Sequence, residues 1–492
     1  MIILFNPRST SPGKQPLPLS LMALAAVLEG RHAWTLVDGN LEGDPAARII
    51  EIAQALPAQP ASVLAVTVMP GPQLAQAVPV CRQVRTAVPG LPIVWGGYFP
   101  TQHSEAVLSA PYVDYVVRSQ GELAFLSLIN VLQAGGALSA VNNLSWHDGR
   151  RVVHNAVCPL TPPDQFPDPP YHAVRLAQYI RPTYLGLRTI AYNSSFGCPF
   201  ACAFCASAAM AGRQWVAQSP KRMETTVRHL VDAYQVDGLQ MNDLDFFVSE
   251  ARTAEYCDRT QDLRVGWWAM GRADILTRYA PATWRLMRAA GVRMIFTGAE
   301  SGSDEALARM NKGGQASTDV TLEFVRRAKE YGVVPELSFV LGSPPDPFAD
   351  MQRTFEFIRT LKRVNAEAEI VLYIYTPVPA DGALYEMAQK AGFRFPETLD
   401  DWASDSWGQF ALRKGARLPW VASGLRRQIR DFERVLNAYY PTVTDLRLTG
   451  WRRDLLRFLS AGRYHLRFYA APYELRAAQR LFHYQRPETT GF

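Results

Sequence analysis

Short, continuously apolar runs alternate with helix-like stretches along the first part of the chain. Each run is followed by polar or glycine-bearing residues, a pattern typical of strands that are buried on both faces of a parallel sheet. We therefore predict a Rossmann-like, doubly wound α/β domain over residues 1–136, with a ligand site at the carboxyl edge of its strands. The expected strands are Ile2 to Phe5, Trp34 to Val37, Val63 to Val68, Ile93 to Trp95 and Tyr115 to Val117.

A second series of apolar runs and helix-like stretches follows a proline-rich segment. Six prolines between Pro159 and Pro170 disfavour a regular helix and predict an extended linker, bounded here at residues 137–186. The second series, residues 187–395, contains six βα units and favours a partial TIM-like (β/α)6 barrel. Its expected strands are Thr189 to Asn193, Gly238 to Met241, Gly266 to Ala269, Met294 to Thr297, Glu336 to Val340 and Ile370 to Ile374.

Residues 396–492 are rich in arginine and aromatic side chains and show no strand alternation, so a mainly helical C-terminal domain is expected. Two interpretations of this domain remain open. In the first, the domain covers a substrate, and its arginines bind acidic groups while its aromatic side chains contact a flat or greasy ligand. Alternatively, it is an amphipathic helical cap whose arginines are solvated.

Composition and charge narrow the class of protein. A chain of 492 residues with 48% hydrophobic and 20% charged residues is expected to form two or three globular domains and is not mainly disordered. The formal charge of +6 is uneven, because residues 413–486 carry 16 Lys or Arg and only 5 Asp or Glu. The rest of the chain is net acidic. Nucleic-acid binding by the basic segment remains open, but no recognisable RNA or DNA module accompanies its charge. Peripheral membrane contact by the basic segment remains open.

The sequence indicates a protein of a reducing compartment. No apolar stretch is long enough to span a membrane. The run Leu17 to Leu28 is interpreted as the first helix of a βα unit rather than a signal peptide. Three of the six cysteines lie within eight positions and three are scattered, which favours a metal site over disulfides. We expect a cytoplasmic protein.

The strongest motif is Gly197-Cys198-Pro-Phe-Ala-Cys202-Ala-Phe204-Cys205, directly after the first strand of the second domain. Three thiolates in one loop can each bind a different iron of a [4Fe–4S] cluster, which leaves the fourth iron open for a small chelating molecule. Zinc is the rival metal, but a fourth ligand at short spacing is missing from the sequence.

This run resembles the signature of the radical S-adenosylmethionine (SAM) superfamily. The resemblance implies that the open iron is chelated by SAM, that Phe204 packs near the adenine, and that SAM is cleaved to a 5′-deoxyadenosyl radical. It continues through Asp243, Arg272 and the run Gly298-Ala-Glu300-Ser301-Gly302, with Lys312-Gly313 beyond. Asp243, Arg272, Glu300 and Ser301 are thereby candidate SAM contacts, although structural caps or ion pairs would explain them equally simply. Gly342-Ser-Pro-Pro345 departs from the family pattern and receives no role.

A doubly wound domain before such a barrel resembles the cobalamin-binding branch of the superfamily. Asp38-Gly39-Asn40-Leu41-Glu42-Gly43 stands where many cobalamin proteins carry a D-x-H-x-x-G loop, with Asn40 in place of the histidine that would ligate cobalt. The lower face of cobalt would then have no histidine ligand. A domain kept only for packing or assembly remains the alternative. The candidate cobalamin contacts are Asp38, Asn40, Thr67, Gly96, Gly97, Thr101, Gln120, Gly121 and Glu122.

The resemblance implies an enzyme with three cofactors, namely a [4Fe–4S] cluster, SAM and cobalamin. The leading hypothesis is a methyltransferase that methylates an unactivated carbon of a small or hydrophobic substrate. It would take electrons from an external flavodoxin- or ferredoxin-type donor. The main alternative is a non-methylating reaction of the same branch, such as oxidative cyclisation, hydroxylation or ring rearrangement, as in bacteriochlorophyll ring cyclases. A non-catalytic cobalamin or iron–sulfur sensor is the second alternative.

Overall fold

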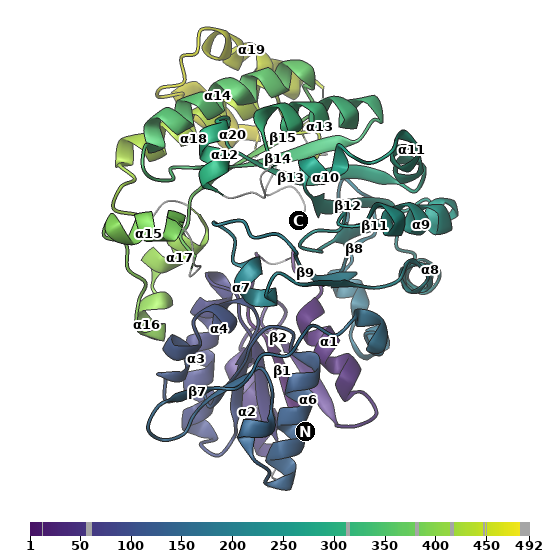
Figure 1. The fold of residues 1–492 in the computed structure, drawn as a ribbon, viewed down its shortest axis with the longest axis vertical. Helices are drawn as coiled ribbons and strands as arrows, with labels where there is room; N and C mark the ends of the chain where they lie inside the picture. The colour runs from purple at the N-terminus through teal and green to yellow at the C-terminus, as the bar shows by residue number, and fades with distance from the viewer. Residues whose placement is uncertain are drawn as a thin grey trace.

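The chain stacks a sheet domain, a barrel domain and a helical C-terminal region along one long axis (Figure 1). The computed structural model describes residues 1–482 except residues 12, 56–61, 311–314, 379–382, 414–417, 446–447 and 449. The carboxyl edge of the first sheet faces the barrel, so the two domains meet at the edge where parallel sheets bind ligands.

The N-terminal domain is built on a seven-stranded sheet in the order β2-β1-β3-β4-β5-β6-β7, in which the first five strands are parallel. All five residues of its central strand β1 are buried, as its continuous apolar sequence predicts. The five parallel strands are β1 (Ile2–Asn6), β2 (Trp34–Asp38), β3 (Val63–Thr67), β4 (Ile93–Gly96) and β5 (Tyr115–Val117). The helices are α1 (Leu19–Leu28), α2 (Pro45–Ala55), α3 (Pro72–Ala87), α4 (Tyr98–Gln102), α5 (Ser104–Leu108) and α6 (Glu122–Ala134).

The prediction of a linker over residues 137–186 is wrong in its first part. Strands β6 (Leu144–His147) and β7 (Val152–His154) form an antiparallel hairpin that extends the N-terminal sheet. The hairpin loop is an Asp-Gly turn, in which Gly149 has a φ of 94° and the Asp148 carboxylate accepts the following backbone N–H groups. The prolines come after this hairpin. Their segment crosses to the barrel through short 3-10 turns at Pro163–Gln165, Tyr171–Ala173 and Leu176–Tyr179.

The second domain is an open, six-stranded parallel sheet in the order β15-β14-β13-β12-β11-β8, as a partial barrel requires. Its strands are β8 (Thr189–Tyr192), β11 (Gly238–Met241), β12 (Gly266–Gly271), β13 (Val292–Glu300), β14 (Val334–Leu341) and β15 (Glu369–Ile374). A small antiparallel ribbon, β9 (Ser195–Gly197) with β10 (Trp215–Ala217), flanks the cysteine run. The helices are α7 (Ser207–Ala211), α8 (Pro220–Tyr234), α9 (Glu250–Thr260), α10 (Ala273–Leu276), α11 (Pro281–Ala289), α12 (Asp304–Arg309), α13 (Thr318–Glu330) and α14 (Pro347–Val364).

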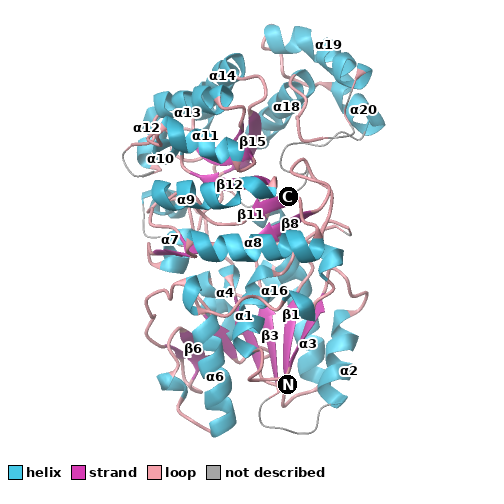
Figure 2. Cartoon of the chain, turned by 90° about the vertical axis from the view of Figure 1, so that its right-hand side faces the viewer, coloured by secondary structure: helices cyan, strands magenta, loops and turns pink. Residues whose placement is uncertain are grey.

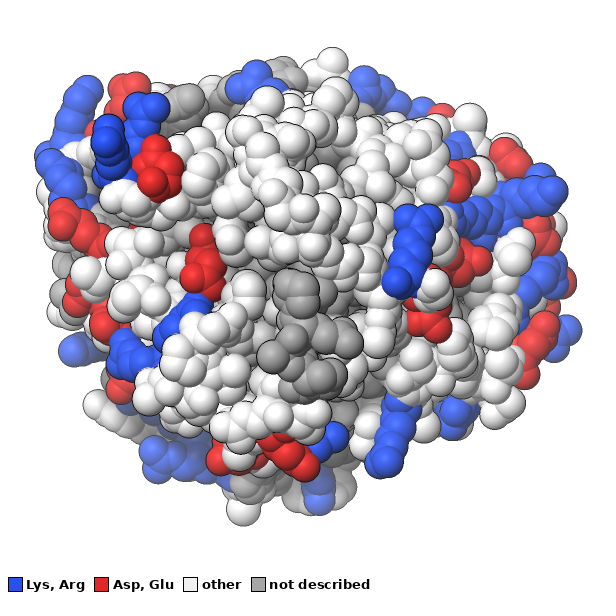
Figure 3. Space-filling model, turned by 90° about the horizontal axis from the view of Figure 1, so that it is seen from below, with Lys and Arg blue, Asp and Glu red and all other residues white. Residues whose placement is uncertain are grey.

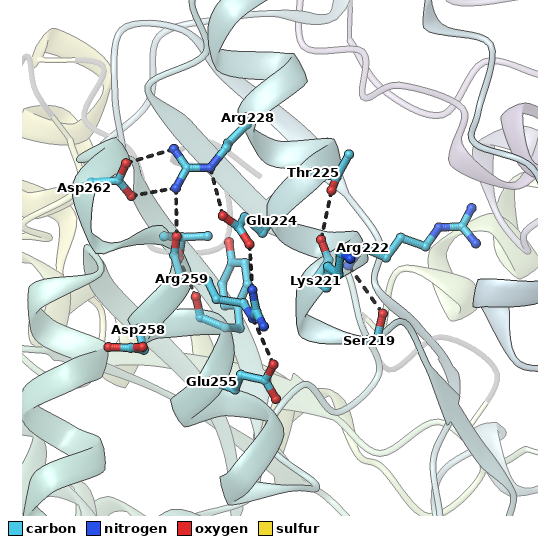
Figure 4. A network of polar contacts seen from close by, with 12 residues as sticks. Ser219, Lys221, Arg222, Glu224, Thr225, Arg228, Glu255, Asp258, Arg259 and Asp262 are labelled. Carbon is cyan, nitrogen blue, oxygen red and sulfur yellow. Dashed lines mark hydrogen bonds and ion pairs between the residues drawn. The ribbon is translucent and has the colours of Figure 1, made fainter.

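Helices α8 and α9 are joined on the outside of the barrel by a network of ion pairs (Figure 4). Arg228 pairs with Glu224 and Asp262, and Arg259 pairs with Glu224 and Glu255. The Ser219 hydroxyl caps the first turn of α8 by accepting the backbone N–H of Arg222. These charged groups lie at the surface, so the network fixes how the helices lie against each other more than it stabilises the fold.

The C-terminal helices divide into two groups. Helices α16 (Leu399–Trp402) and α17 (Asp405–Ala411) leave the barrel and reach the N-terminal domain, where Arg82 of α3 pairs with Asp400 (Figure 1). Helices α18 (Ser423–Tyr439), α19 (Trp451–His465) and α20 (Tyr473–Phe482) pack beside α14 on the outside of the barrel (Figure 2). Helix α15 (Ala383–Lys390) precedes both groups. Among the described C-terminal helices, it is therefore the first group that covers the space between the domains.

Charge is dispersed on the face shown in Figure 3, which views the molecule from the end of the N-terminal domain. Basic and acidic side chains are intermixed around its rim, with a broad uncharged area at the centre. This distribution offers no single-sign surface to a polyanion on that face. Among the described residues, no helix is both long and apolar enough to cross a membrane.

Candidate active site

A cavity of about 720 Å³ lies between the carboxyl edge of the N-terminal sheet and the barrel. We call it the sheet-edge cavity. Its N-terminal wall contains the ends of β3, β4 and β5 together with the first turns of α1 and α6. Its opposite wall contains Asn193, Ser195 and Asn242 from the barrel, and Phe166 from the proline-rich segment. A cavity of this size and position suits a large, flat ligand held by backbone and a few polar groups.

Six of the nine predicted cobalamin contacts line this cavity. Gly97 shows why this edge needs glycine, because its φ is 98° and a Cβ there would meet the Thr67 hydroxyl at 3.1 Å and Val68 backbone atoms at 3.3 and 3.4 Å. The Gln120 side chain donates a hydrogen bond to the Thr161 carbonyl oxygen and accepts one from the Thr161 backbone N–H. The six lining residues are Thr67, Gly96, Gly97, Gln120, Gly121 and Glu122.

The other three predicted contacts, Asp38, Asn40 and Thr101, do not line the cavity. The Asn40 amide oxygen accepts the backbone N–H groups of Ser9 and Thr10, and its NH₂ donates to Asp38 at 2.8 Å. The Asp38 carboxylate also accepts from the buried Tyr179 hydroxyl at 2.9 Å. The Thr101 hydroxyl donates to the carbonyl oxygen of Gly97. These residues hold the loops behind the cavity wall in the cofactor-free chain, and their contact with cobalamin stays a prediction.

The cysteine run lies in the loop between β9 and α7, at the carboxyl end of the first barrel strand. Cys198, Cys202 and Cys205 are all partly exposed, and none of the six cysteines of the chain is in a disulfide. No three His, Cys, Asp or Glu side chains of the described residues converge on a single point that would hold one metal ion. The loop thus lacks the closed shell of a tetrahedral zinc site, whereas a [4Fe–4S] cluster binds each thiolate through a separate iron.

Cationic and acidic side chains surround this loop. The Arg272 guanidinium lies 3.5 Å from the Cys202 sulfur, stacks 4.0 Å from the Phe200 ring centroid, and pairs with Asp274 at 2.9 Å. Asp245 lies in the loop that follows β11, where burial raises its pKa to about 7. Its Oδ2 atom is buried and has no hydrogen-bond partner among the described residues. An unpartnered carboxylate oxygen beside the cysteine loop fits the cationic sulfonium and ammonium groups of SAM.

Asp243 takes a different position from the one expected. Its side chain is fully buried and accepts hydrogen bonds from the backbone N–H of Ser194 at 3.1 Å, from the Ser194 hydroxyl at 2.8 Å, and from the Ser195 hydroxyl. Arg252 donates to the same Ser194 hydroxyl at 2.7 Å. This geometry ties the strand that leads into the cysteine loop to β11, so Asp243 positions the loop rather than facing an open site.

The Glu300-Ser301-Gly302 run begins at the last residue of β13. Glu300 is buried and has a φ of 61°, a conformation that non-glycine residues rarely adopt and that often marks functional sites. A Cβ on Gly302 would lie 2.6 Å from the Cβ of Phe357 and 2.7 Å from the Arg353 carbonyl oxygen, so only glycine fits against α14. The buried Ser301 hydroxyl accepts the backbone N–H of Ser303 at 3.1 Å. Lys312-Gly313 lie outside the described residues.

Comparison with known proteins decides the family. Residues 9–129 match the family model described as the B12 binding domain, and residues 192–358 match that of the radical SAM superfamily. The chain is a B12-binding radical SAM protein. It is 25% identical over 366 residues to an uncharacterized methyltransferase of Pyrococcus horikoshii, covering 74% of this chain and 76% of the relative. It is 26% identical over 375 residues to the anaerobic magnesium-protoporphyrin IX monomethyl ester cyclase of a Synechocystis species, covering 74% and 72%.

The fold of this B12-binding radical SAM protein has a solved counterpart. The radical SAM methyltransferase TsrM from Kitasatospora setae, solved with cobalamin and a [4Fe–4S] cluster, superimposes with a TM-score of 0.67 at 15% identity and covers 98% of each chain. The predicted fold class is thereby confirmed in its three parts, namely the Rossmann-like sheet, the partial barrel and the helical C-terminal region.

Three site features escaped the sequence. Asp245 is two positions from Asp243 in the same motif. The sequence does not show that the Asp243 carboxylate is hydrogen-bonded within the protein while one oxygen of Asp245 has no partner among the described residues. His103 was not among the candidate site residues, and its ring packs against Trp402 at 4.6 Å and Phe395 at 5.1 Å between centroids. The first turns of α1 line the sheet-edge cavity, and only their place at the end of β1 could have indicated this.

Proposed function

We propose that this protein is a cobalamin-dependent radical SAM methyltransferase that methylates an unactivated carbon of a small-molecule substrate. One observation carries the proposal: the sheet-edge cavity of the B12 binding domain opens toward the barrel edge that bears the cysteine loop. Two cofactors that must act on one substrate carbon require this juxtaposition.

The described residues offer cobalamin a cavity and offer the cluster three thiolates. Cobalamin would lie in the sheet-edge cavity against Gly96, Gly97 and Gly121, with Thr67, Gln120 and Glu122 as polar neighbours. The amide oxygen of Asn40 accepts hydrogen bonds from Ser9 and Thr10, so Asn40 is not free to ligate cobalt. The cluster would be held by Cys198, Cys202 and Cys205. In the cofactor-free chain, burial raises the pKa of Cys198 to about 12, so binding iron releases a proton there.

SAM would be held at the barrel edge by residues around the open iron. Asp245, Glu300 and Ser301 supply acceptors for its ammonium and hydroxyl groups, and Arg272 supplies a cation for its carboxylate. Phe204 packs among Met310, Val340, Tyr375 and Leu384, where it offers an apolar face to the adenine. When bound, the cluster supplies the electron that cleaves SAM to a 5′-deoxyadenosyl radical, and cobalamin supplies the methyl group.

The chain's own contribution is to orient and to exclude water. Helices α16 and α17 connect the barrel to the N-terminal domain, so the space between the cofactors is covered on one side. The Asp243, Ser194 and Arg252 network fixes the base of the cysteine loop against β11. Both features shield a reactive intermediate from solvent and hold the reacting groups at a constant separation.

The decisive test is anaerobic reconstitution with iron, sulfide, hydroxocobalamin and SAM, followed by product analysis under reducing conditions with candidate substrates. Formation of 5′-deoxyadenosine together with S-adenosylhomocysteine is expected for a radical methyl transfer. No deoxyadenosine with any substrate would contradict radical chemistry and favour a cobalamin or iron–sulfur sensor.

A second candidate function rests on the relatives. An oxidative cyclisation of the kind named for the Synechocystis relative uses the same domain order, and identity to that relative matches identity to the methyltransferase. Deoxyadenosine without S-adenosylhomocysteine in the reconstituted reaction would favour this function over methyl transfer.

We propose three features of the cellular setting. An external flavodoxin- or ferredoxin-type donor reduces the cluster, since none of the described residues forms a second cysteine group. The protein works in the cytoplasm, which six cysteines without a disulfide support. The outer helices α19 and α20 contact an anionic membrane surface, which their exposed apolar side chains and arginines support.

A further inference from the structure

A second cavity, of about 280 Å³, lies where the two proposed cofactor sites meet, and we call it the aromatic cavity. Met69, Pro70 and Tyr98 line both this cavity and the sheet-edge cavity, while Phe204 enters it from the cysteine loop. The ends of β14 and β15 and the residues around α16 and α17 complete its walls. A molecule in this cavity would therefore lie between cobalamin and SAM, which is the place that the proposed function requires for its substrate.

The walls of the cavity are mostly aromatic rings that are already packed against one another. Phe395 stacks on Trp402 at 5.5 Å between centroids, and Phe99 meets Trp402 edge-on at 5.1 Å. His103 lies 4.6 Å from Trp402 and 5.1 Å from Phe395. Burial lowers the pKa of His103 to about 4, so its imidazole is neutral at pH 7. Rings held in place by other rings favour a flat, rigid ligand, because little side-chain freedom is lost on binding.

Among the described residues, Arg413 supplies the only charged side chain that lines the cavity. It lies 4.9 Å from the Tyr373 ring centroid, and its charge acts on the Tyr98 hydroxyl. No carboxylate of a described residue forms an ion pair with it. The cavity is also lined by Gln102, whose Oε1 atom is buried without a hydrogen-bond partner among the described residues. One cation and one unused acceptor, placed in an aromatic box, match an anionic group and a hydrogen-bond donor on one ligand.

Size limits the ligand further. At about 280 Å³, the cavity lies at the lower end of the volumes of ligand pockets. This volume suits one ring or two fused rings with a short side chain. The aromatic cavity is smaller than the sheet-edge cavity of about 720 Å³, so we expect a macrocycle such as protoporphyrin IX to be too large for it.

We propose that the aromatic cavity binds a small aromatic carboxylic acid of one or two rings, with its ring against Trp402 and Phe395 and its carboxylate on Arg413. The assignment rests on the proposed function, because it places this acid as the substrate between the two cofactors. Gln102 would accept a hydrogen bond from an N–H or O–H group of the ring.

Calorimetric titration of the anaerobically reconstituted holoprotein tests the proposal with two matched probes, indole-3-acetate and its uncharged analogue indole-3-acetamide. We expect the acid to bind roughly tenfold or more tightly than the amide, because a charge-assisted hydrogen bond to Arg413 is lost in the amide. Arg413→Gln should remove this preference, whereas Arg427→Gln, an exposed arginine of α18 outside the cavity, should keep it. Trp402→Leu should weaken both probes, and protoporphyrin IX should not compete with the acid.

Deoxyadenosine formation in the same samples separates the two proposals. Samples that cleave SAM but bind the acid no better than the amide would overturn the substrate assignment and leave the proposed function intact. Competition by protoporphyrin IX, or an acid preference that survives Arg413→Gln, would also overturn the assignment. Samples that bind cobalamin and the acid but never cleave SAM would instead refute the radical reaction. Retention of the cobalamin absorption spectrum shows that each variant is folded.

Discussion

At the scale of single residues, the site separates groups that act from groups that position them. The three cysteines of the loop are surrounded by fixed polar contacts, with Asp243 engaged by two serines and Arg272 engaged by Asp274. Against this background the unpartnered oxygen of Asp245 stands out, since a buried polar atom without a partner is costly unless a ligand satisfies it.

Cys202→Ala is expected to abolish cluster binding and to leave cobalamin binding intact, because Cys202 does not line the sheet-edge cavity. Iron and sulfide content and the visible absorption of the two cofactors measure this. Cys158→Ala, a partly exposed cysteine outside the loop, is the control and should keep both cofactors. A Cys202→Ala protein with a full cluster and full SAM cleavage would refute the metal assignment.

Asp245→Asn is expected to weaken SAM binding by roughly tenfold while the cluster is retained, since a neutral amide replaces the carboxylate that would face the SAM cation. Equilibrium binding of SAM to the reconstituted protein measures the effect. Asp262→Asn, in the exposed network of α8 and α9, removes a carboxylate of the same type far from the loop and should leave SAM affinity unchanged. Equal affinities in both variants would exclude Asp245 from the SAM site.

At the scale of elements, the carboxyl ends of the barrel strands carry the candidate site, and their amino ends carry a buried group of polar residues. Their carboxyl ends present the cysteine loop, Asp245 and Glu300 to the site. Their amino ends bury a second polar group of residues, in which the Trp268 indole donates to Glu336 at 2.7 Å and Thr442 donates to Glu369 at 2.8 Å. This second group joins the barrel to the segment before α19, so it serves stability rather than catalysis.

Gly302→Ala is expected to destabilise the protein by about 1–3 kcal/mol, because the added methyl group overlaps the backbone of α14. Urea denaturation followed by circular dichroism measures the loss. The matched control is Gly462→Ala within α19, where a Cβ meets no atom within 4 Å and helix propensity predicts a gain of up to about 1 kcal/mol. Equal stabilities of the two variants would show that the α14 contact is looser than the geometry indicates.

Stability is expected to fall as the pH rises from about 4.5 to about 8, in part because of Glu336. Burial raises the pKa of this carboxyl from 4.5 to about 8, so in that window the folded protein holds a proton that the unfolded chain has lost. The buried neighbours Glu369, whose pKa is raised, and Lys362, whose pKa is lowered to about 8, titrate in the same environment. The loss from Glu336 approaches at most about 1.4 kcal/mol per pH unit.

Glu336→Gln should flatten this pH dependence, because the amide keeps an acceptor for the Trp268 indole and cannot ionise. Melting temperatures from pH 5 to pH 9 measure it. Glu323→Gln, a variant of an exposed glutamate of α13, serves as the control and should follow the wild type. A wild-type slope in the Glu336→Gln protein would show that another group controls stability in this range.

At the scale of the whole molecule, part of the excess positive charge of the tail lies on the outer helices, since residues 451–482 carry seven arginines and two acidic residues. Trp451, Phe458 and Leu466 of this region expose 65%, 79% and 81% of their surface, and arginines lie among them. These helices lie at the end of the molecule remote from the N-terminal domain (Figure 2). Exposed apolar side chains beside arginines are typical of surfaces that contact anionic membranes.

We expect the protein to sediment with phosphatidylglycerol vesicles at low salt and not with phosphatidylcholine vesicles. A variant with Phe458→Ser and Leu466→Ser should lose most of this binding. Leu187→Ser, which changes an exposed leucine before the first barrel strand, should retain it. Vesicle binding that is unchanged by the double substitution would refute this surface as the contact, and no binding to anionic vesicles would refute membrane association.

The sequence by itself determined the order of domains, eleven parallel strands to within two or three residues at each end, and the metal-binding loop. Apolar runs and cysteine spacing are local patterns, so they can be recognised in the sequence before the tertiary structure is known. The hairpin of β6 and β7 was readable too, from its Asp-Gly turn, but the prolines that follow it dominated the interpretation.

Only the tertiary structure decided which polar side chains are hydrogen-bonded within the protein and which remain available to a ligand. Asp243 and Asp245 are two positions apart on one strand end, yet one is saturated by serines and the other keeps an unpartnered oxygen. His103, Trp402 and Arg413 lie in one cavity although about 300 positions separate the first from the others. Side-chain partners depend on elements that meet in space, and sequence separation carries no information about those meetings.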